Sequence, residues 1–358
     1  MLVECKIEDI DFFNIINRSN SLLSNFDYTE IDRSFYEKHI KSRIPPRIFD
    51  VHVHINLEEH IAMVPEERWY SDWALECGHL LPCDDAHSIA KELFPDSRYE
   101  IAGFPWPINE ADLAGNNQYL AKMGAEGKLK PFMCVKPEWE PDYIERTLVE
   151  GGFVGFKPYP DMVTDVKGAD ISIFGFLPHE QCKILDRYGK AVMLHLPRKE
   201  RIADRDNIRE LLELRQRYPN ITIIIAHFGR SFCPIYLRKG LKRMGDVRGF
   251  YFDTSAVINP EVYDVALDFI DPSKILFGTD MPITLWHGKQ KWRRKRYINI
   301  PREEFTWKKL RKPKEEPFYN LILYEQVRSI LDAFERNRLG KEEKEGIFYG
   351  NAIRALKL

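Results

Sequence analysis

Residues 48–54 read IFDVHVH, a stretch that is typical of a β-strand buried on both of its faces. Seven more short apolar runs follow it, and amphipathic stretches separate them. The eight runs are residues 48–54, 100–104, 130–135, 153–157, 191–195, 221–227, 249–253 and 274–280. Between them, residues 178–188 and 204–218 have the apolar spacing and the Pro or Gly boundaries of helices.

Eight strand–helix units predict an α/β fold, a distorted (β/α)8 TIM barrel, which needs roughly 250 residues. The chain has 358 residues, so other segments flank the barrel. A doubly wound open sheet is the alternative, but no G-x-G-x-x-G motif follows the first strand. We expect a helical N-terminal arm, the barrel, a basic loop or lid, and C-terminal helices that complete the barrel, over residues 1–47, 48–284, 285–316 and 317–358.

Composition and charge exclude several classes of protein. The chain is 44% hydrophobic and 30% charged, as a globular protein is, and its net charge of −2 argues against general nucleic-acid binding. No apolar run is long enough to form a membrane helix, and the N-terminus does not read as a signal peptide. The six cysteines are spread out and form no C-x-x-C pair. We therefore expect a cytoplasmic protein that binds neither membranes nor nucleic acid.

Metal-competent side chains stand at the carboxyl ends of four predicted strands. His52 and His54 share one face of the first strand because side chains alternate along a strand. His195, His227 and Asp280 end the fifth, sixth and eighth strands. The carboxyl ends of barrel strands form the catalytic face, so these five groups predict a metal site there. Imidazole and carboxylate suit zinc, iron, manganese or nickel and do not single out one of them.

Other strand-end residues are candidates for substrate contact. Lys157 ends the fourth strand, where a charge is costly unless it is paired, carbamylated or functional. Arg198 and Arg230 each follow a strand-end histidine by three residues. There they would either grip a carboxylate or phosphate or pair with acids of neighbouring loops. Tyr159 is a further candidate for substrate binding.

Residues 286–316 carry a local excess of positive charge. They hold 12 Lys and Arg against 4 Asp and Glu, so their formal charge is +8 and the rest of the chain carries −10. A loop after the eighth strand emerges at the catalytic face, so we expect a lid that favours an anionic substrate; a solvated loop is the alternative. Trp286, Trp292 and Trp307 indicate that part of this segment packs.

The motifs DVHVH, GFKPYP, LHLPR, IIIAHFGR and FGTDMP, in this order and spacing, resemble those of the amidohydrolase superfamily. The similarity is closer to the amidohydrolase-related branch, which holds aminocarboxymuconate-semialdehyde decarboxylase, resorcylate decarboxylases and several lactonases. Within that branch the chain is most similar to uncharacterised bacterial members. The resemblance covers about residues 45–282. It implies that His52, His54, His195 and Asp280 ligate a divalent metal, usually Zn²⁺, and we expect no organic cofactor.

The resemblance leaves the metal count open. A carbamylated Lys157 would bridge two ions, and His195 and His227 would then hold the second one. In the mechanism that we expect, the ion activates a water molecule and His227 orients it. Asp280 then accepts the proton of that water and returns it to the leaving group. Members of the branch are often dimers, so the resemblance implies a homodimer built by the N-terminal arm and the C-terminal helices.

These residues predict a metal-dependent hydrolase of a small, anionic ester, lactone or amide that carries a carboxylate or phosphate. Non-oxidative decarboxylation of an aromatic or muconate-type acid is the alternative, although the decarboxylases of this branch generally lack the strand-four lysine. Outside enzymes, the alternative is an inactive barrel that serves as a binding or scaffold protein.

Overall fold

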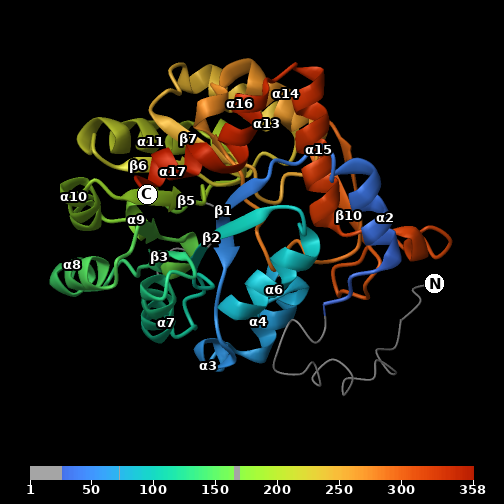
Figure 1. Cartoon of the computed structure of the whole chain (residues 1–358). Coiled ribbons are helices and arrows are strands. Elements are labelled where there is room, and N and C mark those ends of the chain that lie inside the picture. Colours follow the sequence, from blue (N-terminus) through green and yellow to red (C-terminus); the bar gives the residue numbers. More distant parts are fainter. Residues whose placement is uncertain (1–25, 72, 165–169) are drawn as a thin grey trace, which may run out of the picture.

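The computed structural model describes residues 26–71, 73–164 and 170–358, and within them eight parallel strands form one sheet in sequence order. Helices surround these strands (Figure 1). All eight predicted strands are present, so the (β/α)8 barrel is confirmed. The strands are β1 Arg47–His54, β2 Arg98–Phe104, β3 Lys130–Cys134, β4 Gly155–Lys157, β5 Ala191–Leu194, β6 Thr222–Ile225, β7 Phe250–Asp253 and β8 Ile275–Leu276.

The barrel closes between its last and first strands through backbone hydrogen bonds. The Val51 amide donates to the Phe277 carbonyl at 3.0 Å, and the Asp280 amide donates to the His52 carbonyl at 2.9 Å. The last strand contains only two residues, and most of this seam lies in the segment that follows it. The seam therefore brings Asp280 beside His52, although 228 positions separate the two residues in the sequence.

An irregularity in β1 decides where its histidines point. The pairing register between β1 and β2 shifts between Asp50 and Val53. Val51 belongs to the apolar cluster inside the barrel, whereas Val53 belongs to the cluster between strands and helices. Both His52 and His54 therefore face the barrel mouth, as the H-x-H spacing predicts, but an unbroken alternation from Val51 would have turned them outward.

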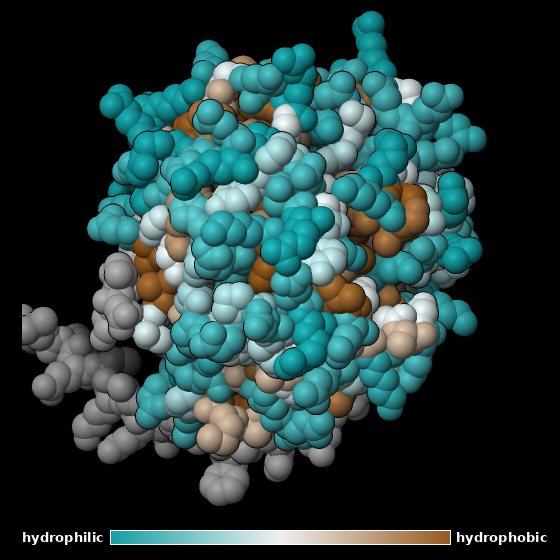
Figure 2. All heavy atoms as spheres, turned by 90° about the vertical axis from the view of Figure 1, so that its left-hand side faces the viewer, coloured by the Kyte–Doolittle hydropathy of each residue, from teal (hydrophilic) through white to brown (hydrophobic). Residues whose placement is uncertain are grey.

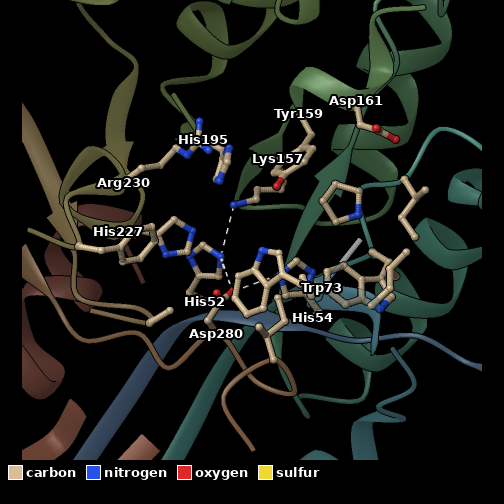
Figure 3. A pocket seen from close by; sticks show the side chains of 18 of the residues that line it. His52, His54, Trp73, Lys157, Tyr159, Asp161, His195, His227, Arg230 and Asp280 are labelled. Atoms are coloured by element: carbon tan, nitrogen blue, oxygen red, sulfur yellow. Dashed lines mark hydrogen bonds and ion pairs between the residues drawn. The ribbon is translucent and has the colours of Figure 1, made fainter. Parts of the chain in front are cut away.

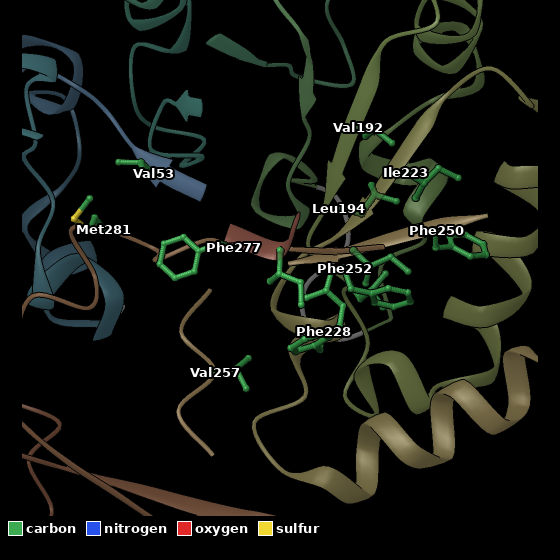
Figure 4. Packing of buried hydrophobic residues seen from close by; sticks show 14 of the residues in the cluster. Val53, Val192, Leu194, Ile223, Phe228, Phe250, Phe252, Val257, Phe277 and Met281 are labelled. Carbon is green, nitrogen blue, oxygen red and sulfur yellow. The ribbon is translucent and has the colours of Figure 1, made fainter. Parts of the chain in front are cut away.

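Helices cover the outside of the barrel, and the two helices predicted by apolar spacing are confirmed as α10 His179–Tyr188 and α11 Arg205–Arg217. Val192, Leu194 and Ile223 of the strands pack outward into the cluster that these helices cover (Figure 4). Polar side chains dominate the surface on this side of the molecule (Figure 2). The other helices of the outer layer are α6 Cys83–Leu93, α7 Leu113–Ala125, α8 Pro141–Glu150, α13 Pro234–Met244 and α14 Pro260–Phe269.

The flanking segments add helices and one hairpin. In the predicted N-terminal arm, α2 Glu30–His39 is helical, and residues 1–25 lie outside the described part of the chain. After the last barrel helix, the C-terminal segment folds as α15 Ile322–Arg336, α16 Lys341–Glu345, a π-helical turn over Gly346–Gly350 and α17 Asn351–Leu356. Ala352, Ala355 and Leu356 of α17 pack into the inner barrel cluster. None of the described helices is long and apolar enough to span a membrane.

The basic segment after β8 differs from the expected loop. It contains an antiparallel hairpin of β9 Gly288–Arg293 and β10 Arg296–Pro301. In β9, exposed Lys289 and Lys291 alternate with Gln290, which is buried, as the period of a strand requires. Charged residues are so frequent in this segment that the two-residue period of a strand could not be recognised from its sequence. Trp286 and Trp307 pack with their ring centroids 5.7 Å apart, so part of the segment packs as expected.

Between β1 and β2 the chain forms short helices that reach the barrel mouth. They are α3 Glu58–Ile61, α4 Glu66–Ser71 and α5 Trp73–Cys77. Two further short helices, α9 Ile173–Phe176 and α12 His227–Arg230, follow β4 and β6.

Candidate active site

A cavity of about 190 Å³ opens at the carboxyl ends of the barrel strands, and we call it the site cavity. Eight of the nine residues that the sequence singles out line it, and Arg198 is the exception. The eight residues converge on the cavity from β1, from the end of β4 and from the segments that follow β4, β5, β6 and β8 (Figure 3). They are His52, His54, Lys157, Tyr159, His195, His227, Arg230 and Asp280.

Two histidines of β1 meet one carboxylate at the base of the cavity. The Nε2 atoms of His52 and His54 lie 3.2 and 3.3 Å from Oδ1 of Asp280. This oxygen is buried and accepts no hydrogen bond from the part of the chain that the structure describes. The ligand atoms of the three residues all lie within 4.8 Å of one another. Two imidazole nitrogens and an unsatisfied carboxylate oxygen at this spacing fit a divalent metal ion.

Asp253, at the end of β7, fixes the orientation of His52. Its Oδ2 lies 2.9 Å from Nδ1 of His52, and both side chains are buried. Burial alone would raise the pKa of Asp253, but His52 and His227 hold it well below its usual value. An ionised carboxylate only accepts hydrogen bonds, so Nδ1 of His52 donates to Asp253. In the neutral ring this contact leaves the lone pair on Nε2, where it can bind a metal. Asp253 is not among the predicted site residues, although it ends a predicted strand as Asp280 does and so has the same signal in the sequence.

His227 and His195 complete the group of imidazoles. Nδ1 of His227 lies 2.9 Å from the Ser255 carbonyl oxygen, which can only accept, so the Nε2 atom is the unprotonated one. Burial lowers the pKa of His227 to about 4. Burial also lowers the pKa of His195 well below its usual value, with Arg230 adding to the effect. The His195 ring packs on Tyr159, with centroids 4.7 Å apart.

Lys157 is buried at the centre of the site. Its Nζ lies 3.5 Å from Nε2 of His52 and 4.5 Å from the centroid of the Phe104 ring. Burial lowers the pKa of this amine to about 8. Its charge is therefore placed against an aromatic face and a histidine, and among the described residues it forms no salt bridge with a carboxylate.

The two predicted arginines have different surroundings. Arg198 forms a forked ion pair with Glu210, with N–O distances of 2.9 and 3.0 Å. It therefore pairs with an acid, but that acid lies on the helix α11 and not on a neighbouring loop. Arg230 lines the cavity and donates from Nη1 to the carbonyls of Leu196 and Pro197 at 3.0 and 2.6 Å. Arg201, which is not among the predicted site residues, lines the cavity as well.

The sequence profile of the family described as "Amidohydrolase" matches residues 49–358, which include the barrel and the site. The chain belongs to the amidohydrolase family. The resemblance of its sequence motifs is thereby confirmed, and the chain is a metal-dependent enzyme of the amidohydrolase superfamily. No curated protein matches the sequence of this amidohydrolase.

Solved structures similar to this amidohydrolase include decarboxylases and a hydrolase. A dihydroxybenzoic acid decarboxylase from Polaromonas sp. JS666, with bound manganese and 2-nitroresorcinol, has a TM-score of 0.53 and 18% identity, over 88% of this chain and 98% of its own. A 5-carboxyvanillate decarboxylase from Sphingomonas paucimobilis has a TM-score of 0.52 and 12% identity, over 88% of this chain and 100% of its own.

The hydrolase is named a probable 2-pyrone-4,6-dicarboxylic acid hydrolase, comes from Acinetobacter baumannii and contains bound citric acid. It has a TM-score of 0.52 and 17% identity, over 87% of this chain and 99% of its own. At these sequence identities, the three similarities show only that this amidohydrolase shares a fold with the three proteins. Its own reaction has to be argued from the residues of its site.

Proposed function

We propose that this amidohydrolase hydrolyses an ester, lactone or amide bond in a small anionic molecule, with one divalent ion held by His52, His54, His195 and Asp280. The observation that carries the proposal is the approach of two Nε2 atoms to a buried Asp280 oxygen that accepts no hydrogen bond from the described residues. A divalent ion in such a site supplies a Lewis acid that makes hydroxide available near neutral pH. We propose zinc as that ion, and the manganese of the Polaromonas decarboxylase makes manganese the alternative.

Hydrolysis needs groups that accept a proton from the attacking water, and the site offers two. Asp280 carries a carboxylate that is ionised at neutral pH and can therefore accept a proton. His227 presents an unprotonated Nε2 because Nδ1 donates to Ser255. We assign to His227 the orientation of the water, and to Asp280 the acceptance of its proton and the return of that proton to the leaving group.

Decarboxylation is the second candidate, and Lys157 is the observation that favours it. Loss of carbon dioxide leaves a carbanion that needs a proton, and the buried Lys157 ammonium lines the cavity as a donor. Two of the similar solved structures carry the names of decarboxylases, which agrees with this candidate. If Lys157 instead reacts with carbon dioxide to form a carbamate, we expect the site to hold two ions. A homodimer and a cytoplasmic location stay predictions.

Isotope tracing separates the two reactions. We would load the purified protein with Zn²⁺ or Mn²⁺ and screen carboxylated lactones and esters together with hydroxybenzoates. In ¹⁸O-labelled water, hydrolysis places the label in the carboxylate product, whereas decarboxylation in D₂O places deuterium on carbon and releases carbon dioxide. The proposal expects the first result and its loss in Asp280→Asn. Deuterium on carbon without ¹⁸O uptake would replace hydrolysis with decarboxylation.

A further inference from the structure

Two arginines in the site cavity have no acidic partner among the described residues. Four cationic side chains line the cavity, and two of them are accounted for: Arg68 pairs with Asp161 at 2.8 Å, and Lys157 lies against His52. The other two, Arg201 and Arg230, form no salt bridge with any carboxylate that the structure describes. A guanidinium this close to the interior without a counter-charge is costly, so the cavity has an unmet preference for an anion.

Backbone carbonyls and an aromatic frame hold these two guanidinium groups in place. Arg201 donates from Nη1 to the carbonyl of Arg230 at 3.0 Å, while Arg230 is fixed by the two carbonyls after β5. The Arg201 guanidinium lies 5.4 and 5.2 Å from the ring centroids of Phe232 and Tyr236. Each guanidinium has five N–H donors, so these contacts leave donors for a ligand.

The β9–β10 hairpin contributes one residue to this corner of the cavity. Tyr297 of β10 lines the cavity, and its hydroxyl is close enough to Arg201 and Arg230 to feel their charge. Its ring packs against Phe232 with centroids 5.3 Å apart. A residue from the basic segment that the sequence predicted as a lid therefore stands next to the unpaired arginines.

Backbone strain singles out the same residues. Nine non-glycine residues in the described part of the chain have a positive φ, and five of them line the site cavity. Those five are Arg201 at 59°, His227 at 54°, Arg230 at 63°, Ala256 at 53° and Asp280 at 68°. Left-handed backbone is unfavourable for such residues and gathers where a function requires it. The two arginines therefore share this unfavourable backbone conformation with His227 and Asp280, which belong to the candidate active site.

We propose that Arg201 and Arg230, together with Tyr297, form an anion subsite that binds a carboxylate of the substrate remote from the bond that reacts. The inference rests on the proposed function, because it takes the metal cluster as the place where that bond lies. The paired forks of two arginines match the planar, two-oxygen geometry of a carboxylate. The substrate class is thereby narrowed to esters, lactones or amides that keep a free carboxylate after the bond is cleaved.

Binding of dicarboxylates tests the subsite without turnover. Malonate, succinate, glutarate and isophthalate would each be compared with its monoamide by calorimetry on the zinc-loaded protein. One carboxylate of a diacid can lie at the metal and the other at the subsite. We expect at least one diacid to bind about tenfold more tightly than its monoamide, as charge-assisted hydrogen bonds allow. If no diacid of the series has an advantage, the subsite does not exist.

Variants test whether the tighter binding of a diacid than of its monoamide depends on the two arginines. Arg201→Gln and Arg230→Gln are expected to remove it while zinc content stays at the wild-type level. Lys291→Gln is the matched control, because Lys291 is an exposed cation of the same hairpin that does not line the cavity. An equal loss in Lys291→Gln, or an advantage that survives in both arginine variants, would overturn the proposal in favour of a general positive potential.

A conservative variant completes the test, and an assay of ester hydrolysis separates the subsite from the proposed function. If a glutamine variant fails to fold, Arg201→Lys keeps the charge but loses the fork, and it is expected to lose most of the diacid advantage; an undiminished advantage would contradict the subsite. A wild-type protein that favours diacids but hydrolyses no ester keeps the subsite and loses the proposed function. Ester hydrolysis without any diacid advantage would keep the proposed function and exclude the subsite.

Discussion

Nδ1 of His52 lies 2.9 Å from Oδ2 of Asp253, so the seventh strand of the barrel sets the protonation state of a histidine on the first. Asp253 also accepts hydrogen bonds at Oδ1 from the His227 and Ser255 amides, at 2.8 and 3.1 Å. One carboxylate therefore orients a metal-cluster histidine and anchors the backbone of the histidine proposed to orient water.

Replacing Asp253 by Asn is expected to weaken metal binding about 10- to 100-fold, the range found for such outer partners. The amide would donate to Nδ1 of His52 and move the ring proton to Nε2, where the metal needs a lone pair. Competition with a chromophoric chelator measures the affinity. Asp246→Asn, at an exposed carboxylate that bonds Arg248, is the control. Unchanged affinity in Asp253→Asn would show that the His52–Asp253 contact is without effect on the site.

Metal removal is expected to abolish turnover and lower the melting temperature, because an ion that binds only the folded state stabilises it by mass action. Added Zn²⁺ should restore both in the wild type. His54→Ala removes one of the converging nitrogens, so its melting temperature should not respond to Zn²⁺. His179→Ala, at a histidine bonded to Tyr218 away from the site, should respond as the wild type does. An equal response of His54→Ala would place the ion elsewhere.

His287 is expected to make the stability of this enzyme depend on pH. Its Nε2 and Nδ1 lie 2.9 Å from carboxylate oxygens of Asp32 and Glu303, which tie α2 and the segment after β10 to the barrel. Burial alone would lower the pKa of His287, but hydrogen bonds and charges of the two acids raise it above 6.5. A raised pKa in the folded state means that the contribution is complete below about pH 6.5 and is lost as the pH rises through the raised value.

His287→Leu would leave both acids without this partner, and we expect it to cost about 3 kcal/mol of unfolding free energy at about pH 6. The difference from the wild type should shrink towards about pH 9, because the wild-type ring loses its charge as the pH rises through its raised pKa. Urea unfolding at the two pH values measures this difference in unfolding free energy. The ion pair between Arg302 and Glu303, at 3.1 Å, is present in both proteins and therefore does not contribute to the difference. A difference that does not depend on pH would mean that His287 acts through packing alone.

Gly155 of β4 is expected to tolerate no side chain. A Cβ there would lie 2.1 Å from the Ala191 carbonyl oxygen of the neighbouring strand, so Gly155→Ala has to separate β4 from β5. We expect a loss of about 1–3 kcal/mol in stability, together with weaker metal binding because Lys157 and its neighbours shift.

Gly175→Ala is the matched control for that substitution. A Cβ at Gly175 would meet nothing closer than 3.8 Å, and this residue lies in the helix α9. It is expected to leave stability unchanged or raise it by about 0.5–1 kcal/mol. Urea unfolding of the two variants measures both effects. A Gly155→Ala protein as stable as the wild type would show that the β4–β5 contact adapts.

The strands and the main site residues could be predicted from the sequence because both depend on local patterns. Short apolar runs fix the strands, and in a parallel barrel every carboxyl end reaches one rim. His195, His227 and Asp280 lie just past strand ends, so their meeting at the cavity follows from position alone. His52 and His54 were assigned to the inner face correctly, although the register shift that keeps them there is visible only in the structure.

The directions of loop side chains could not be predicted in this way. Arg198 and Arg230 have the same spacing from a strand-end histidine, yet Arg198 turns to Glu210 and Arg230 lines the cavity. Arg201 reaches the cavity through a left-handed backbone that no periodicity signals. Tyr297 reaches it on a hairpin whose alternation was hidden by its charges.

The sequence by itself determined the barrel, the rim on which the chemistry lies and the imidazoles and carboxylate that gather there. Strand periodicity is a local property of the sequence, and in a parallel barrel every strand ends at the same rim. Only the tertiary structure decided which acid orients His52, which arginines have no counter-charge among the described residues and which residue the hairpin contributes to the cavity. Those outcomes depend on contacts between residues far apart in the chain, and such contacts exist only once the barrel has closed.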